Sequence, residues 1–329
     1  MQTRIIRLGP NGTAPFHSPH DFARLPANTN LCVIHELRSQ QSLGGWWPTC
    51  LRTMLQGKVF ARSGRLLAEV DDQSFAVTEP GAGPEFEVTL GEPSFLVTLV
   101  PAASLLRQLI DPAERQEAEY PVLFAARYDR ESRPYWLLRQ LATECFVNEA
   151  ESIDDGGITE RVLAGVRSAQ ESFEPFIERC PGRRLHHRRE LFARLQRVRS
   201  LMESNFQGDI DIDHMGAIAS LSPTHFIRVY KQVFGETPHR ALARSKLGQA
   251  ARLLARSSRT ITEIGRMLGF ENRSAFARWY RKETGESASE ARERMRAAGT
   301  GGAAATLLRT SGPEEDTERS QQRERVALG

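Results

Sequence analysis

The sequence predicts an α+β protein with a β-rich N-terminal part and an all-helical C-terminal part. Three observations support this fold class. Short runs rich in Val, Phe and Thr, separated by Gly, Pro and Asp turns, fill residues 31–100. After Pro101 the apolar residues recur at helical spacing. A ten-residue motif then occurs twice, as FIRVYKQVFG at 226–235 and as FARWYRKETG at 276–285.

The β-rich part contains many short strands at close spacing, which favours a sandwich or a small barrel over a parallel sheet. The helices that we expect next cover residues 102–110, 135–149, 159–173 and 188–206. The aromatic residues of the β region could line a pocket, although aromatic side chains in a small β domain usually belong to the core. They are Trp46, Trp47, Phe60, Phe75, Phe86 and Phe95.

Charge is distributed unevenly along the 329 residues, whose formal net charge is +3. Residues 183–296 carry 23 Lys and Arg against 12 Asp and Glu, or +11, whereas residues 1–182 carry 17 against 24, or −7. A basic block beside an acidic one is expected of a nucleic-acid binder. We predict one domain at 1–182, a second at 183–296 and a disordered tail at 297–329, where small and charged residues offer little to bury.

Several function classes find no support in the sequence. Neither a secretion signal nor a membrane-spanning stretch is found, so we expect a cytoplasmic protein. The four cysteines are scattered without metal-ligand spacing, which leaves incidental thiols or a redox-sensing pair. No nucleophile motif such as GxSxG occurs, and His35 has no HxH neighbour. We therefore predict no enzyme, no catalytic residue, no metal site and no cofactor.

Each copy of the repeated motif predicts an amphipathic helix. In the first copy Phe226, Val229, Tyr230 and Val233 form one apolar stripe, which we assign to the core. A shorter helix precedes each copy, at 213–220 and 262–268, and each contains an apolar–Gly pair that would let the next helix approach closely. Two helices joined by a tight turn, the second with a basic outer face, predict a helix-turn-helix unit.

The two units are joined by a predicted helix at 238–257, and Ser222 and Asn272 are placed to cap the two repeated helices. Twenty helical residues span about 30 Å, close to the roughly 34 Å between successive major-groove faces of DNA. The repeat thus predicts two recognition helices held one turn of DNA apart. The alternative that remained open is an ordinary helical bundle with a basic surface.

Residues 196–296 resemble the AraC/XylS family of bacterial transcription regulators, whose pattern includes I-x-E-I-A-x-x-x-G-F, S-x-F-x-R-x-F-K and G-x-S-P-x-x-Y-R. The matching residues of this chain are Ile261, Glu263, Ile264, Gly269, Phe270, Ser274, Phe276, Arg278, Gly285 and Ser287. The chain departs from the pattern at Gly265, Tyr280, Ala288 and Ala291. The last two departures bear on how the final helix docks.

The resemblance implies a sequence-specific regulator, more often an activator, that binds double-stranded DNA and recruits RNA polymerase. It also implies a cupin-like domain at 1–182 that senses a small-molecule effector and forms a homodimer through 135–173. The residues that it places against DNA are Thr224, Ile227, Arg228, Lys231, Arg273, Ser274, Ala277, Arg278 and Arg281. Arg side chains suit guanine, whereas Lys231 and Arg281, further along each helix, suit phosphates.

Two other functions compete with this interpretation. An architectural DNA binder without an effector would not need the acidic N-terminal part. A DNA-repair alkyl-transfer protein needs clustered cysteines around a zinc-bound acceptor, which the scattered cysteines do not offer.

Overall fold

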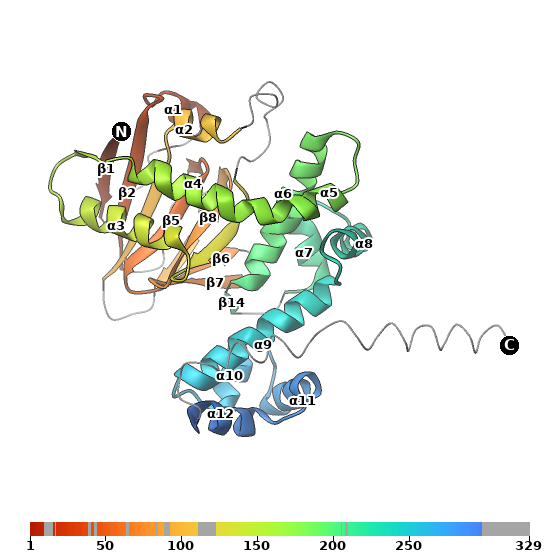
Figure 1. The fold of residues 1–329 in the computed structure, drawn as a ribbon. Coiled ribbons are helices and arrows are strands. Elements are labelled where there is room, and N and C mark those ends of the chain that lie inside the picture. The colour runs from red at the N-terminus through yellow and green to blue at the C-terminus, as the bar shows by residue number, and fades with distance from the viewer. Residues whose placement is uncertain are drawn as a thin grey trace. The chain divides into compact units, whose positions relative to one another are not determined.

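The computed structural model describes residues 1–9, 16, 18–38, 41–42, 45–63, 66–82, 85–88, 93–110, 123–204, 206–207 and 210–297. The chain forms two compact units, Met1–Ala241 and Leu242–Gly329 (Figure 1). The tail predicted at 297–329 lies outside the described residues except for Ala297, which ends a helix. The predicted functional boundary between 182 and 183 stays a prediction.

The first unit contains a mixed seven-stranded sheet with the strand order β12-β8-β5-β11-β2-β1-β13. Its strands are β1 (Gln2–Leu8), β2 (Thr29–Leu37), β5 (Cys50–Gln56), β8 (Ser74–Thr78), β11 (Ser94–Val100), β12 (Ala126–Asp129) and β13 (Ser152–Asp154). β1 runs parallel to β2, and the other neighbours are antiparallel. The sequence predicted the β-rich character of 31–100, but it missed β1, β12 and β13.

Two smaller sheets complete the β structure among the described residues. A five-stranded sheet has the order β14-β7-β6-β10-β3, and β4 pairs with β9. Their bounds are β3 (Gln41–Ser42), β4 (Trp46–Trp47), β6 (Val59–Ser63), β7 (Leu66–Val70), β9 (Gly81–Ala82), β10 (Glu85–Val88) and β14 (Phe206–Gln207). Because Phe206 pairs with β7, the helix predicted to run to 206 ends earlier.

Most helices of the first unit follow β11, and β12, β13 and β14 lie between them, whereas α1 (Pro19–Ala23) precedes β2 and was not predicted. The others are α2 (Ala103–Gln108), α3 (Arg133–Val147), α4 (Ile158–Gln170), a 3-10 turn (Glu171–Phe173), α5 (Glu174–Arg179), α6 (Leu185–Glu203), α7 (Ile212–Ile218) and α8 (Pro223–Phe234). The four helices predicted between 102 and 206 are confirmed to within a few residues at each end. α5, which follows directly on the 3-10 turn, was not predicted.

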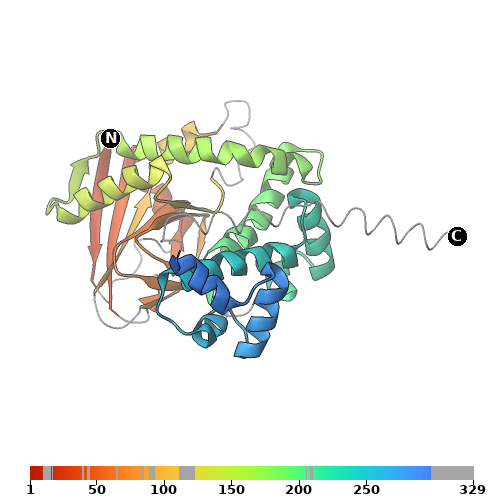
Figure 2. The same ribbon diagram turned by 60° about the horizontal axis from the view of Figure 1, so that its bottom comes forward.

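The seven-stranded sheet buries both of its faces. Helices α3 and α4 cover one face (Figure 1, Figure 2), where Ile34, Val97 and Leu138 share a core. The opposite face carries a second core around Val33 and Leu96, because successive residues of a strand point to opposite sides.

The segment 135–173, through which the resemblance implies dimerisation, includes most of α3. The apolar stripe of α3 is divided between core and surface and consists of Trp136, Leu137, Leu141, Cys145 and Phe146. Leu141 and Cys145 are buried against the sheet, whereas Trp136 and Phe146 are exposed, at 57% and 39%. Cys145 also lies beside Cys32 of β2, and this contact together with burial raises the pKa of the Cys32 thiol well above its usual value. The full stripe therefore does not face solvent.

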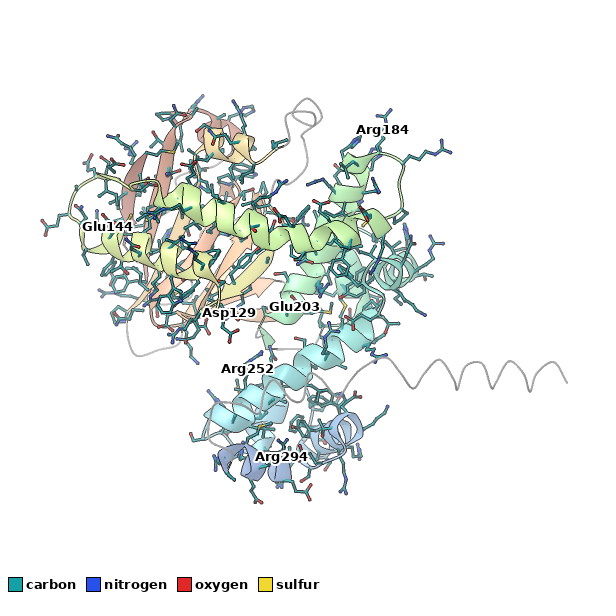
Figure 3. The ribbon with its side chains drawn as sticks, viewed as in Figure 1. Asp129, Glu144, Arg184, Glu203, Arg252 and Arg294 are labelled. Atoms are coloured by element: carbon teal, nitrogen blue, oxygen red, sulfur yellow. The ribbon has the colours of Figure 1, made fainter. Side chains whose placement is uncertain are left out.

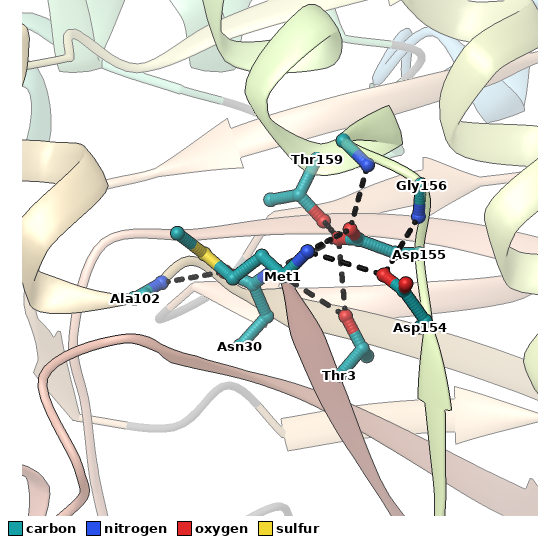
Figure 4. A network of polar contacts seen from close by, with 9 residues as sticks. Met1, Thr3, Asn30, Ala102, Asp154, Asp155, Gly156 and Thr159 are labelled. Atoms are coloured by element: carbon teal, nitrogen blue, oxygen red, sulfur yellow. Dashed lines mark hydrogen bonds and ion pairs between the residues drawn. The ribbon is translucent and has the colours of Figure 1, made fainter.

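A polar network at one end of the sheet joins β1, β2, β13 and α4 (Figure 4). The buried carboxylate of Asp155 accepts hydrogen bonds from the side chains of Thr3, Asn30 and Thr159, at 3.2, 2.9 and 2.5 Å. Asn30 in turn accepts from the backbone N–H of Ala102 at 2.8 Å. Burying these polar groups is tolerated because each finds a partner.

In the second unit, all regular secondary structure among the described residues is helical. The unit contains α9 (Pro238–Arg256) from Leu242 onward, followed by α10 (Ile261–Met267), α11 (Arg273–Thr284) and α12 (Ala288–Ala297). Ala288 and Ala291, where the chain departs from the family pattern, are 3% and 0% exposed and pack into the core of this unit with Met295. The final helix thus docks through small side chains. An ion pair between Arg294, labelled in Figure 3, and Glu286 ties it to the preceding turn at 2.6 Å.

Candidate DNA-contacting helices

Each compact unit contributes one short helix followed by a longer, amphipathic one. α7 and α8 form the pair in the first unit, and α10 and α11 form the pair in the second. The first turn covers residues 219–222 and the second covers 268–272, so the second turn is one residue longer, as the offset of the repeats predicts. Ser220 and Gly269 adopt positive φ in these turns, at 53° and 82°.

The glycines of the two apolar–Gly pairs lie against the turn or the helix that follows them. The carbonyl of Gly216 accepts from the Leu221 N–H, and the carbonyl of Gly265 accepts from the Phe270 N–H, both at 2.9 Å. A Cβ on Gly265 would meet Phe276 of α11 at 3.0 Å, whereas one on Gly216 would meet the Leu221 carbonyl oxygen at 2.8 Å. The predicted close approach is present at both glycines, but at Gly216 the nearest neighbour is the turn.

Side-chain caps fix where most of these helices begin. Asp211 accepts from the backbone N–H of His214 at 2.7 Å, and Asn272 accepts from that of Ala275 at 2.9 Å. Thr260 and Glu263 form a capping box, in which the backbone N–H of Thr260 lowers the pKa of Glu263. Ser222 occupies the N-cap position of α8, as predicted, but its side chain makes no capping hydrogen bond.

The final glycine of each repeat ends its helix. Gly235 and Gly285 adopt φ of 76° and 82°, a left-handed conformation that glycine tolerates without strain. The N–H of Gly235 donates to the Lys231 carbonyl at 2.9 Å, and that of Gly285 donates to the Arg281 carbonyl at 2.8 Å. The repeated Gly therefore terminates both helices by the same geometry.

The apolar stripe of α8 is core, as predicted. Phe226, Tyr230 and Val233 are fully buried. Phe234 packs on Phe176 of α5 with ring centroids 5.4 Å apart. The Gln232 amide also donates to the Arg179 carbonyl at 3.0 Å, so this side of α8 is fixed against α5.

The inner side of α11 is held by aromatic packing within the second unit. Phe276 and Tyr280 are fully buried, and the ring of Phe270 lies 5.4 Å from Phe276 and 4.9 Å from Trp279. The Lys246 ammonium of α9 lies 5.3 Å from the centroid of Phe270. These contacts leave the opposite side of α11 toward solvent.

The predicted contact residues lie on the outer faces of these two helices. On α8, Thr224, Arg228 and Lys231 are exposed and Ile227 is half-buried. On α11, Arg273, Ser274, Arg278 and Arg281 are exposed and Ala277 is half-buried. The structure thus gathers four of them on α8 and five on α11.

Additional exposed groups adjoin both sets of predicted residues. His225 lies beside Thr224 at the start of α8, and Lys282 follows Arg281 on α11. Arg266 is exposed on α10, the shorter helix of the second pair. The repeated motif did not predict these groups, because the residue types at their positions differ between the two repeats. Their charge and helical spacing were the signals that could have identified them.

The described residues hold few features of other function classes. No three His, Cys, Asp or Glu side chains among them are grouped closely enough to bind a metal ion. Within the same residues, no helix is sufficiently long and apolar to cross a membrane. All four cysteines are buried.

Residues 215–294 match the family model of the helix-turn-helix domain. The MmsAB operon regulatory protein of Pseudomonas aeruginosa is 30% identical over 109 residues, which cover 33% of this chain and 35% of that protein. The HTH-type transcriptional activator RhaS of an Enterobacter species is 31% identical over 101 residues, or 31% of this chain and 36% of that protein. The chain thus spans about a third of the length of these relatives.

Solved structures also match this chain over part of its length. A transcriptional regulator from Chromobacterium violaceum, described as an AraC-type DNA-binding domain-containing protein, is 27% identical. The match covers 31% of this chain and 91% of that chain, with a TM-score of 0.29.

Proposed function

We propose that this chain, which carries an AraC/XylS-type helix-turn-helix domain, is a sequence-specific DNA-binding transcription regulator that reads DNA through α8 and α11. The observation that carries the proposal is the duplicated helix pair. Both copies bury an aromatic stripe, end at a left-handed glycine and present exposed basic side chains on the outer face. The family and the named relatives are regulators, in agreement with the prediction of a non-enzyme.

The outer faces combine the two kinds of contact that sequence-specific binding needs. Arg228 and Arg278 lie near the middle of their helices, where a guanidinium can donate two hydrogen bonds to one guanine. Lys231 and Arg281 lie one turn further on, and we assign them to phosphates, which position the protein without specifying a base. Ile227 and Ala277 offer apolar contact, for example to a thymine methyl group.

The connecting helix α9 suits binding in two successive major grooves. Its 19 residues correspond to about 28 Å, compared with roughly 34 Å for one helical turn of DNA. We infer that the recognition site consists of two short boxes about one turn apart. Each box would be read by one helix.

The N-terminal part would supply regulation. We assign residues 1–182 to a cupin-like domain that senses a small-molecule effector and forms a homodimer. The mixed β-sheet region supports this assignment only at the level of fold class. Because one relative is named a transcriptional activator, we propose activation through RNA polymerase in the cytoplasm.

Of the two competing functions, alkyl transfer fits least well. An acceptor thiol must be reachable by DNA, whereas all four cysteines are buried. An architectural protein would bind every duplex through phosphates, so non-cognate DNA would displace it from any site.

The direct experiment is to recover the chromosomal sites bound by the tagged protein in its host. A regulator gives sharp peaks that share two short boxes about one helical turn apart. Diffuse coverage without a common sequence would overturn the proposal and favour the architectural alternative.

A further inference from the structure

One face of the seven-stranded sheet holds a group of polar side chains within an apolar core. This is the face opposite α3 and α4, where Val33, Met54 and Leu96 form part of the core. His35, Arg52 and Thr98 each lie two residues away from one of these apolar residues on the same strand. Because side chains two residues apart in a strand point the same way, they share that face. Their exposed fractions are 2%, 6% and 0%.

Arg52 is a buried cation with no carboxylate partner among the described residues. Its Nη1 donates to the Thr78 hydroxyl at 2.6 Å, and its guanidinium carbon lies 5.3 Å from the ring centroid of Trp47. The Nε and Nη2 groups are buried without a hydrogen-bond partner. Since a buried charge without a counter-charge is costly, this arrangement calls for an anion.

The neighbouring polar groups are unpartnered in the same way. Thr98 is the cross-strand partner of Arg52, and its buried hydroxyl makes no hydrogen bond. His35 lies one strand further, with its ring 6.3 Å from Trp47 and both of its nitrogens without a partner. Burial and the charge of Arg52 lower the pKa of His35 to about 4, so that His35 is neutral at pH 7 and Arg52 alone carries charge.

The free edge of Arg52 is the edge that a carboxylate prefers. Nε and Nη2 lie side by side and can donate to one carboxylate group. Arg197 of the same protein presents this edge to Glu79, with Nε 2.9 Å from the carboxylate oxygen. A lysine side chain cannot reproduce this pair of parallel N–H donors. A neutral ligand would leave the charge of Arg52 unpaired.

We infer that Arg52, Thr98 and His35 bind the carboxylate group of a small organic acid with an apolar body. Arg52 would pair with the carboxylate through Nε and Nη2, and Thr98 and neutral His35 would each donate one hydrogen bond. Trp47 and the surrounding apolar core would contact the rest of the ligand. This site would give the proposed sensor domain its ligand class. Only the effect of the ligand on regulation rests on the proposed function.

Thermal unfolding of the full-length chain without DNA tests this site. The probes are propionate, hexanoate and phenylacetate, each compared with its own amide and with sodium chloride at equal ionic strength. We expect at least one acid to raise the melting temperature by roughly 5 °C at a hundred times its Kd. A shift that the amide or chloride reproduces, or no shift with any acid, would overturn the inference.

Two substitutions make the test specific. Arg52→Met should abolish the shift and, without ligand, should melt no lower than the wild type because an unpaired buried charge is removed. The matched control is Arg139→Met, since Arg139 donates to the Met54 and Leu55 carbonyls at 2.9 and 3.1 Å. That control should melt lower and keep the shift.

A third variant, Arg52→Lys, keeps the test decisive if Arg52→Met folds poorly. Arg52→Lys keeps the charge without the pair of parallel donors, and we expect it to bind the acid at least tenfold more weakly. Wild-type affinity in Arg52→Lys, or a loss of stability in Arg52→Met equal to that in Arg139→Met, would show a satisfied structural arginine and refute the site. Because the assay contains no DNA, its failure leaves the proposed DNA binding untouched.

Discussion

At the scale of single residues, α8 and α11 present similar faces for two different tasks. Arg278 can read a base edge, whereas Lys231 can only place a charge near the backbone. Both side chains are exposed, and neither is hydrogen-bonded to another described residue. Substituting either one should therefore change DNA binding while leaving the fold intact.

Arg278→Ala should cost about 1–3 kcal/mol of binding free energy and relax the preference at one base pair. Lys231→Ala should weaken binding to all sequences alike and flatten the salt dependence. Titrations against a set of single-base variants of one binding site separate the two effects. A uniform loss for Arg278→Ala would make it a phosphate contact.

His35 predicts a pH dependence of stability. Burial lowers its folded-state pKa to about 4, below the usual 6.5 of the unfolded chain. The unfolded state therefore binds a proton first, and stability is lost as the pH falls below about 6.5. Between pH 7 and pH 5, the titration of His35 should lower the free energy of unfolding by about 2 kcal/mol, and His35→Leu should remove this decrease. Urea denaturation of both proteins at each pH measures it, and parallel curves would contradict the burial of His35.

Residue-level prediction succeeded where the pattern was periodic. The buried stripe of α8 follows from a spacing of three and four residues, and the outer face is then fixed by geometry. The buried positions of His35, Arg52 and Thr98 could not be predicted in this way. Which face of the sheet each occupies depends on strand register, and register depends on partners distant in sequence.

At the scale of elements, the two helix pairs share one construction but differ in the neighbour of their central glycine. Gly216 faces a backbone carbonyl oxygen, which cannot move without distorting the turn. Gly265 faces the Cβ of Phe276 at 3.0 Å, so a small displacement of α11 by a few tenths of an ångström would make room for a methyl group. The same substitution should therefore have different costs in the two units.

Gly216→Ala should destabilise the first unit by about 1–3 kcal/mol, because overpacking outweighs the helical preference of alanine. Gly265→Ala should change stability by less than about 1 kcal/mol, since the same preference offsets a milder contact. Urea denaturation monitored by circular dichroism compares the two variants. A larger cost at Gly265 than at Gly216 would contradict this account of the turns.

The elements that sequence reasoning missed share a physical cause. β12 and β13 have only four and three residues, and all three strands, including the seven-residue β1, pair with a strand far away in the chain, as Thr3 pairs with Ile153. The helices were predicted because their periodicity and their caps are local. Of the two predicted caps, the Asn272 side chain makes its hydrogen bond, whereas the Ser222 side chain makes none.

At the scale of the whole molecule, the uneven charge and the duplicated helix pair point to different roles for the two regions of the chain. The basic 183–296 region carries both candidate recognition helices, and the acidic 1–182 region carries the candidate organic-acid site and every described strand except β14. We propose that α8 and α11 each read their own part of one DNA site.

The most direct test is selection of duplexes from a randomised library by the full-length protein, by Arg228→Ala and by Arg278→Ala. We predict that the wild type enriches two short boxes about one helical turn apart, and that each variant loses sequence preference in a different box. Enrichment of no sequence, or loss of the same box in both variants, would contradict the claim that the two helices read separate parts of the site.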